Sequence, residues 1–253
     1  MEEIVITSLD EYIKYIDKLP PEFNLSRGQE KDLPLLPSAM RCDDSGMKLY
    51  SKSTANSFIE DFKINSAQYI DSSLISNEYE WLVYAQHFGV PTCLLDFTYS
   101  HLISIMFAVE NAFNYSEDDD CNSVIWIMNP NELNQKSIKR SEIINISYGE
   151  NRCLDNIEFP CAVTAKKNNP RIAAQNGLFV YFNEDTALEQ TSIADDILRK
   201  VIIPHSCGRK ILKSLFVMGM RFVDIYPELS SISKDILLKN RVKEFYRMEE
   251  NDE

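Results

Sequence analysis

The chain has 253 residues, and its 26 lysines and arginines stand against 39 aspartates and glutamates, a net charge of −13. Hydrophobic residues make up 44% of the chain and charged residues 26%, which supplies a packed core and excludes an intrinsically disordered protein. The negative charge disfavours general binding to nucleic acid, because phosphate backbones select basic surfaces.

No apolar run reaches the length of a membrane span, and the first residues are acidic where a secretory signal is basic. We therefore expect a cytoplasmic protein with no membrane contact. The six cysteines form no Cys-x-x-Cys pair, and no histidine lies at metal-ligand spacing from them. This pattern predicts reduced thiols and no bound metal.

Apolar residues recur at helical spacing in the first half of the chain. The predicted helices are Ser8–Leu19, a stretch within Ser53–Tyr69, Glu78–Phe88 and His101–Phe113. Between the first two, Phe23–Arg27 predicts a short strand that ends in a corner formed by Arg27, Gly28 and Gln29. A compact turn is expected after Pro91, before the fourth helix.

The second half of the chain mixes strands and helices without regular alternation. The predicted strands are Val124–Met128, Gly177–Phe182, Arg199–Ile203 and Arg221–Ile225, and the predicted helices are His205–Met218 and Ser230–Tyr246. Such an order is typical of an α+β fold, with a mixed central sheet and flanking helices. We expect one domain over residues 1–253, with a core over 20–185 and a strand-and-helix section with an acidic tail over 186–253.

Two polar strings predict a ligand site. In the first, Ser26-Arg27-Gly28-Gln29, the arginine offers a planar donor fork for phosphate or carboxylate, and glycine permits close approach. The second runs from Gln86 to Ser100 and leads into the start of a helix, where backbone donors favour an anion. Each string also has a structural interpretation, as an arginine that ties down a loop or as ordinary helix caps.

A third string, Arg171 to Phe179, contains Gln175 and reads as a polar loop before a buried strand. Its glutamine would then satisfy backbone groups of that loop. The sequence lacks a Ser-His-Asp order, a His-Glu-x-x-His helix and a glycine-rich phosphate loop. Triad hydrolases, zinc proteases of that type and P-loop nucleoside triphosphatases therefore have no support.

Taken together, these strings resemble the FRG domain family. The similarity spans about Phe23 to Phe182, and it rests on Arg27-Gly28-Gln29, Pro37-Ser38 with Arg41, Gln86-His87-Phe88-Gly89-Val90-Pro91-Thr92, Leu94-Leu95-Asp96-Phe97-Thr98, Phe107-Ala108 and Gln175-Asn176-Gly177-Leu178-Phe179. The chain departs from the family pattern at three positions. Ser26 replaces an aromatic residue, Cys93 replaces an arginine and Phe97 replaces a tryptophan, so the resemblance implies one charge fewer at the site.

The order of these motifs is also similar to that of ADP-ribosyltransferases. The resemblance implies that Arg27 holds a dinucleotide, that a hydroxyl-bearing strand lines a nicotinamide pocket and that a later strand supplies a catalytic glutamate. This chain offers Gln175 at that later position, so either Asp96 carries the charge or the site binds a nucleotide without cleaving it.

The resemblance thus implies an enzyme that uses NAD as its substrate, an ADP-ribosyltransferase or NAD-glycohydrolase, in a toxin or phage-defence effector. Its partners would be a nucleotide or dinucleotide ligand and a protein acceptor. The implied catalytic residues are Arg27, His87, Asp96 and Gln175, and the implied ligand-binding residues are Arg27, Gly28, Gln29, Gln86, Phe97, Thr98 and Phe179.

Two other interpretations stay open. In the first, the polar strings form the scaffold of a non-catalytic interaction domain, which explains the missing glutamate. In the second, His87 and Asp96 belong to a nuclease, although the net charge of −13 counts against it. All ligand-site interpretations require the distant strings to meet in one pocket, with the Arg27 guanidinium facing the Asp96 segment.

Overall fold

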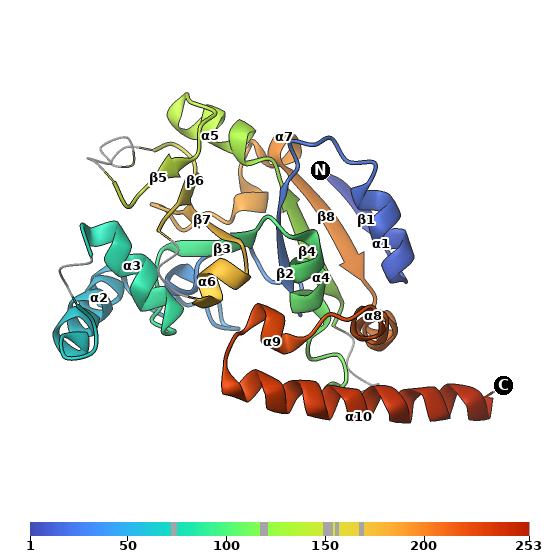
Figure 1. Cartoon of the computed structure of the whole chain (residues 1–253). Helices are drawn as coiled ribbons and strands as arrows, with labels where there is room; N and C mark the ends of the chain where they lie inside the picture. The colour runs from blue at the N-terminus through green and yellow to red at the C-terminus, as the bar shows by residue number, and fades with distance from the viewer. Residues whose placement is uncertain (72–74, 117–120, 149–153, 155–156, 167–169, 253) are drawn as a thin grey trace.

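A mixed sheet runs through the computed structural model, which describes residues 1–71, 75–116, 121–148, 154, 157–166 and 170–252 (Figure 1). Eight strands of the described residues lie in the order β1-β8-β4-β2-β3-β7-β6-β5. They are β1 (Glu2–Val5), β2 (Leu25–Gln29), β3 (Leu94–Thr98), β4 (Ser123–Met128), β5 (Ile144–Asn145), β6 (Cys161–Thr164), β7 (Gly177–Tyr181) and β8 (Leu198–Ile203). The two outer pairs, β1 with β8 and β5 with β6, are parallel and the inner pairs antiparallel. The predicted α+β class with a mixed sheet is therefore confirmed.

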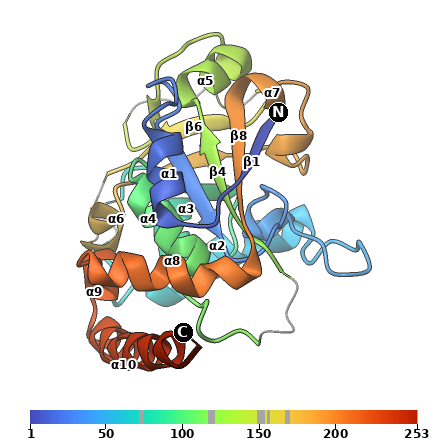
Figure 2. The same ribbon diagram turned by 90° about the vertical axis from the view of Figure 1, so that its right-hand side faces the viewer.

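The helices lie on both faces and at one end of this sheet (Figures 1 and 2). They are α1 (Leu9–Ile16), α2 (Lys52–Ser66), α3 (Glu78–His87), α4 (His101–Val109), α5 (Pro130–Ile138), α6 (Pro170–Ala174), α7 (Ala194–Ile197), α8 (His205–Val217), α9 (Phe222–Ile225) and α10 (Leu229–Asp252), with 3-10 turns at Ser38–Met40 and Leu188–Gln190. None of the helices in the described residues is both long and apolar enough to cross a bilayer.

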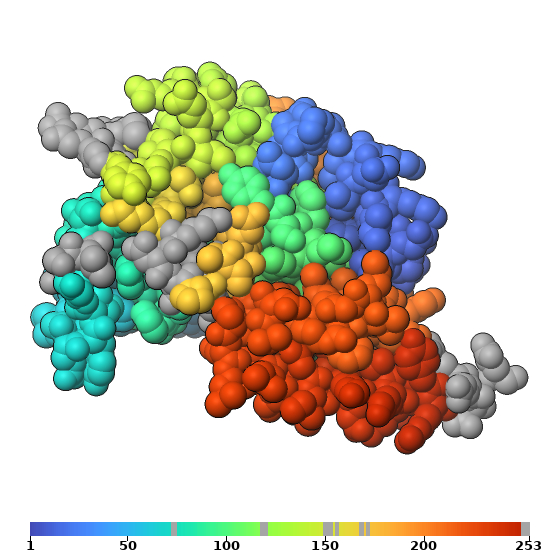
Figure 3. Space-filling view, viewed as in Figure 1, coloured from blue at the N-terminus to red at the C-terminus, as the bar shows by residue number. Residues whose placement is uncertain are grey.

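Three apolar clusters hold the layers together. The largest packs α1, α4 and α8 against one face of the sheet, around Ile125 and Val201. A second, around Trp126 and Phe182, lies on the other face beneath α5 and α7. The third joins α3 to β6 and β7 around Val83. Helices α9 and α10 lie outside α8 and form a ridge along one side of the molecule (Figure 3).

Local signals set many of the helix ends. Ser8, Asn77 and Ser100 are N-caps of α1, α3 and α4, because each side chain accepts a backbone N–H three residues further on. Gly89 follows α3 with a φ of 86°, a left-handed conformation that glycine adopts without strain. These caps explain why the predicted helices at the start of the chain are confirmed, with small shifts of their ends.

Several segments differ from prediction. Strand β3 lies where a compact turn was expected after Pro91, and strand β1 was not predicted. The predicted strand Arg221–Ile225 is wrong, since Phe222–Ile225 forms helix α9. The carboxylate of Asp235 accepts the N–H groups of Phe222 at 2.7 Å and Val223 at 3.2 Å, which caps that helix from α10. The predicted corner at Arg27-Gly28-Gln29 is also wrong, because these residues lie within β2 and pair with β4 along their whole length.

Candidate functional site

The sheet opens between β2 and β3. Five residue pairs join β2 to β4, whereas the register between β2 and β3 consists of one pair, Ser26 with Thr98. A cavity of about 120 Å³ lies at this opening, bounded by α3 and α4. Its lining residues are Ser26, Arg27, Val83, Gln86, His87, Asp96, Phe97, Thr98, Phe107, Gln175, Gly177 and Phe179. The expected convergence of the three polar strings is therefore present.

Arg27 spans the gap between the separated strands. Its Nη1 donates a hydrogen bond to the backbone oxygen of Asp96 at 2.9 Å, and its Nε donates to Oε1 of Gln29 at 3.3 Å. Partial burial lowers the pKa of the Arg27 guanidinium, although an arginine keeps its proton in proteins. The other N–H groups of Arg27 have no partner among the described residues, so they are available to an anionic ligand.

Gly28 and Gln29 lie behind the cavity rather than on its wall. The Gln29 side chain is buried and its Nε2 donates to the backbone oxygen of Leu33 at 2.8 Å. Gly28 packs directly on α4, where a Cβ atom would collide with the backbone oxygen of Ser104. Gln29 thus orients the Arg27 side chain, and Gly28 allows β2 to pack closely on α4.

Asp96 brings a negative charge to the same cavity. It lies in the middle of β3 and its side chain is exposed, flanked by the buried residues Leu95 and Phe97. The carboxylate has no hydrogen-bond or ion-pair partner among the described residues. The charge of Asp96 favours the protonated form of Arg27, which raises the pKa of the guanidinium against the larger effect of burial. The cavity therefore holds one cation and one anion.

The last turn of α3 forms a second wall. Thr92 donates its hydroxyl hydrogen to Oε1 of Gln86 and accepts the N–H of Leu94 at 3.1 Å. Gln86 lines the cavity, and its Nε2 has no hydrogen-bond partner among the described residues. His87 also lines the cavity, and its ring meets the Phe88 ring edge to face at 5.0 Å between centroids.

Gln175 reaches the cavity from the turn before β7. The Thr98 hydroxyl donates to the backbone oxygen of Gln175 at 2.6 Å and accepts the N–H of Ser100 at 3.0 Å. Thr98 is buried, so it acts as a tie between β3 and this turn. The Gln175 amide has no partner among the described residues. The side chain of Arg171, from the same string, lies outside the described part of the chain.

The aromatic residues are placed unequally. Phe97 is 3% exposed, and its ring packs with Leu95 and Trp126 in the cluster on the opposite face of the sheet. Phe97 also lines the cavity, so a stacking role for it stays a prediction. Phe179 is buried beside Leu94. Phe107 of α4 is half-buried on the cavity wall. The sequence analysis did not name it as a site residue, although the Phe107-Ala108 match to the FRG pattern pointed to it.

A buried polar cluster that sequence reasoning missed supports the floor of the cavity. The Ser26 hydroxyl lies 2.9 Å from Nδ1 of His101 and within hydrogen-bonding distance of the Ser104 hydroxyl. Burial lowers the pKa of His101 below its usual 6.5, so the imidazole is neutral at pH 7. The cluster joins β2 to α4 at the point where β2 meets β3.

We expect His101 to make the protein less stable as the pH falls below about 6.5. The unfolded chain binds a proton at His101 before the folded chain does, so stability is full above the unfolded pKa and declines as the pH falls toward the folded one. Melting temperatures of wild type and His101→Gln between pH 7.5 and 5 test this. Equal slopes for both proteins would show that another group controls this range.

Cys93 does not belong to the first cavity. It lines a second, larger cavity, whose wall also includes Leu82 of α3. Burial raises the pKa of the Cys93 thiol to about 12. The FRG pattern has an arginine at the position of Cys93. The missing positive charge therefore affects the second cavity, not the first. No group of three or more histidine, cysteine, aspartate or glutamate side chains in the described part of the chain is arranged to hold a metal ion.

Comparison with known proteins identifies one family. Residues 24–117 match the FRG domain, whereas no curated protein and no solved structure matches the chain. The match includes β2, α3, β3 and α4, which carry most of the cavity, and ends before the Gln175 turn. This chain therefore contains an FRG domain.

Proposed function

We propose that the cavity between β2 and β3 binds NAD or a related nucleotide, and that the protein is an ADP-ribosyltransferase-like enzyme that cleaves the bond between nicotinamide and ribose. The observation that carries the proposal is that Arg27 and Asp96 line the same cavity. Among the described residues, several N–H groups of Arg27 and the carboxylate of Asp96 have no partner. A dinucleotide has matching charges, with an anionic diphosphate and a cationic nicotinamide ring.

Arg27 suits the anionic part of this ligand. A guanidinium presents its N–H groups in a rigid plane that fits two oxygens of a phosphate or carboxylate. The bonds from Arg27 to Asp96 and Gln29 hold this plane in place before a ligand arrives. Such preorganisation reduces the entropy lost on binding.

Asp96 suits the reacting carbon. When the bond between C1′ and the nicotinamide nitrogen breaks, the electron pair goes to that nitrogen and neutralises the ring, and positive charge develops on the ribose. A nearby carboxylate stabilises this charge. Water, or a hydroxyl or amine of an acceptor, then forms the new bond at C1′ and releases a proton. In this proposal the Gln86 and Gln175 amides orient ribose hydroxyls or the carboxamide.

The size of the cavity indicates how much of the ligand it holds. A volume of about 120 Å³ is well below the roughly 300–1,000 Å³ of typical ligand pockets, so one end of a dinucleotide fits inside. The rest must extend outward past Arg27 and Asp96. In this proposal the charged groups lie near the middle of the ligand, beside its diphosphate and ribose.

Arg27→Ala is expected to weaken NAD binding by about 10- to 100-fold, because a charge-assisted bond contributes about 1.5–3 kcal/mol. Asp96→Asn should bind NAD within a few-fold of wild type but release nicotinamide about 10²- to 10³-fold more slowly. Calorimetric titration with NAD and ADP-ribose measures the first effect. Chromatography of free nicotinamide measures the second, both without acceptor and with a protein mixture as acceptor.

Arg140→Ala and Asp224→Asn are matched controls, because both residues are exposed and lie outside the cavity. Both should behave as wild type. The absence of NAD and ADP-ribose binding by the wild-type protein would contradict the proposal. A lower melting temperature of Arg27→Ala together with that absence would instead support the scaffold interpretation, and cleavage of nucleic acid with added Mg²⁺ would support a nuclease.

The toxin or phage-defence role depends on this activity. If the enzyme consumes NAD in a host cell, expression of the wild-type chain should lower cellular NAD and arrest growth. Expression of Asp96→Asn at the same level should do neither.

A further inference from the structure

A second cavity, larger than the first, shares α3 as a wall with it. It encloses about 570 Å³ between α2, α3, the start of β3 and the end of β7. Leu82 of α3 lines this cavity, whereas its neighbour Val83 lines the first. The volume falls within the roughly 300–1,000 Å³ typical of small-molecule sites, and the function proposed above makes no use of it.

The second cavity has an apolar and aromatic part beside its polar and charged lining residues. Ile59 and Phe182 are almost fully buried at its base. Two tyrosine rings add to the walls and are fixed by edge-to-face contacts, Tyr50 with Phe58 at 5.1 Å and Tyr181 with Tyr79 at 5.6 Å between centroids. A ligand body placed here would therefore meet rigid apolar and aromatic surface.

The charges at the rim are not equivalent. Lys48 forms an ion pair with Asp185 across the rim, so these two charges largely compensate. Lys52, at the start of α2, is exposed and has no hydrogen-bond or ion-pair partner among the described residues. Glu184 is also exposed on the rim.

Cys93 shows that the charge of Lys52 acts inside the cavity. Burial raises the pKa of this thiol to about 12, and Lys52 opposes the rise. Lys52 itself lines the cavity, as Cys93 does. No comparable effect of Glu184 on Cys93 is found. The positive charge of Lys52, which has no ion-pair partner among the described residues, therefore acts on the part of the wall that Cys93 forms.

We propose that the second cavity binds a small amphipathic organic anion, with its apolar body between Tyr50 and Tyr181 and its anionic group at Lys52. The site is independent of the first cavity. It requires no covalent step, since the neutral thiol of Cys93 serves as part of the wall.

The probe for this site is 8-anilinonaphthalene-1-sulfonate, which joins an aromatic body to a single anionic group and fluoresces in apolar surroundings. We expect saturable binding of one probe molecule per chain. Lys52→Glu should weaken this binding at least tenfold by reversing the charge. Ala55→Trp should weaken it by a similar factor, because Ala55 lines the cavity and the larger ring would fill it.

Lys239→Glu is the matched control, an exposed lysine of α10 far from the cavity in sequence and outside its lining. It should bind the probe as wild type does, and so should Arg27→Ala, which tests the first cavity separately. Lys52 is exposed, so its variant should keep the wild-type melting temperature even if Ala55→Trp fails to fold.

A chemical readout locates the bound probe. N-ethylmaleimide alkylation, followed by peptide mass spectrometry, should be slowed at Cys93 by saturating probe and unchanged at Cys42, which is exposed. Protection of Cys93 with loss of binding in Lys52→Glu would support the proposal. Non-saturable binding, equal binding by Lys52→Glu and Lys239→Glu, or no protection of Cys93 would overturn it.

Discussion

Gly28→Ala is expected to lower the free energy of unfolding by at least about 3 kcal/mol, or to prevent folding altogether. An added Cβ atom would lie 2.8 Å from the backbone nitrogen of Ala108 and closer still to the backbone oxygen of Ser104. Overpacking a core side chain costs about 1–3 kcal/mol. Here the obstacle is the α4 backbone, which cannot rotate away, so the cost lies at or above the upper end.

Gly208→Ala is the matched control for this substitution. Its Cβ atom would lie 3.2 Å from the Cβ of Ala112, a side-chain contact that a small shift relieves. Gly208 lies inside α8, where alanine is favoured over glycine by about 0.5–1 kcal/mol. The two effects nearly cancel, so urea unfolding should show a large loss for one variant and little change for the other. Similar midpoints for both would contradict the close packing of β2 on α4.

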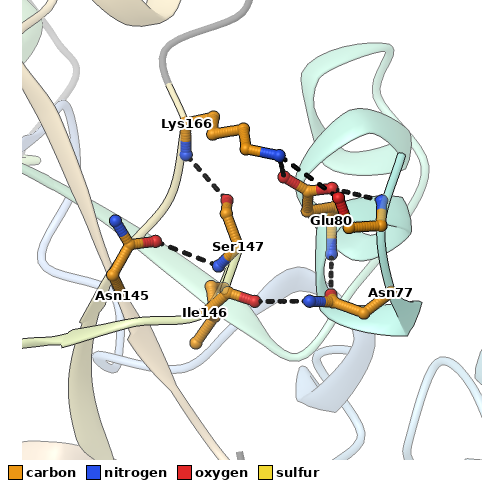
Figure 4. Close-up of polar contacts among 7 residues, drawn as sticks. Asn77, Glu80, Asn145, Ile146, Ser147 and Lys166 are labelled. Carbon is orange, nitrogen blue, oxygen red and sulfur yellow. Dashed lines mark hydrogen bonds and ion pairs between the residues drawn. The ribbon is translucent and has the colours of Figure 1, made fainter. Parts of the chain in front are cut away.

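Glu80→Gln is expected to cost about 2 kcal/mol through loss of a buried ion pair. Glu80 is 3% exposed in the first turn of α3, and its Oε1 lies 3.2 Å from Nζ of Lys166 (Figure 4). Its Oε2 accepts the N–H of Ser76. Breaking a fully buried pair costs about 3–5 kcal/mol, and the partial exposure of Lys166 reduces that figure.

The surrounding contacts show why this pair matters for the site. Asn77 accepts the N–H of Glu80 at 3.0 Å and donates to the backbone oxygen of Ile146 at 2.8 Å. The N–H of Lys166 donates to the Ser147 hydroxyl at 2.8 Å (Figure 4). The network thus fixes α3, which carries Gln86 and His87, to the segments around β5 and β6.

The pH dependence distinguishes this pair from a surface pair. Burial raises the pKa of Glu80, but the hydrogen bonds from Ser76 and Ser147 and the charge of Lys166 outweigh it, so the net pKa is lowered. The stabilisation is therefore complete above the unfolded pKa near 4.5 and is lost as the pH falls through the folded value. Glu80→Gln should remove this part of the acid destabilisation.

Glu78→Gln is the control, since Glu78 lies on the same helix but is 75% exposed in its pair with Lys63. Exposed pairs contribute about 0–1 kcal/mol. Thermal unfolding at pH 7 and pH 3 should therefore separate the two variants at neutral pH and bring Glu80→Gln closer to wild type in acid. An equal loss of stability in both variants at pH 7 would show that burial of Glu80 has no energetic consequence.

The parts of the fold that sequence predicted are those with local signals. Helix α1 has its Ser8 cap, and α3 is followed by Gly89. Strands β4 and β7 are mostly apolar runs, and β8 ends in the apolar run Val201–Ile203. The segments without such signals were missed or misassigned. The polar residues of β1 become a strand only by pairing with β8, and the short apolar run of α9 becomes a helix through a cap donated by α10.

The candidate site also has a part that the sequence predicted and a part that it did not. The motifs identified Arg27, Gln86, His87, Asp96, Thr98 and Gln175, all of which line the cavity. Which side of the sheet each residue faces could not be inferred without the strand register. For that reason the sequence did not predict that Phe97 packs in the cluster on the opposite face of the sheet. It also did not predict the contact between Ser26 and His101, which are 75 positions apart.

The order of strands has a consequence for how this protein can be divided. Within the matched residues 24–117, β2 and β3 share one register pair, while their long partners, β4 and β7, both come from later in the chain. A fragment cut at those limits would leave the backbone of both strands open to other molecules, and such open edges promote aggregation. A stable excised unit would therefore have to include β4 and β7 together with the matched residues.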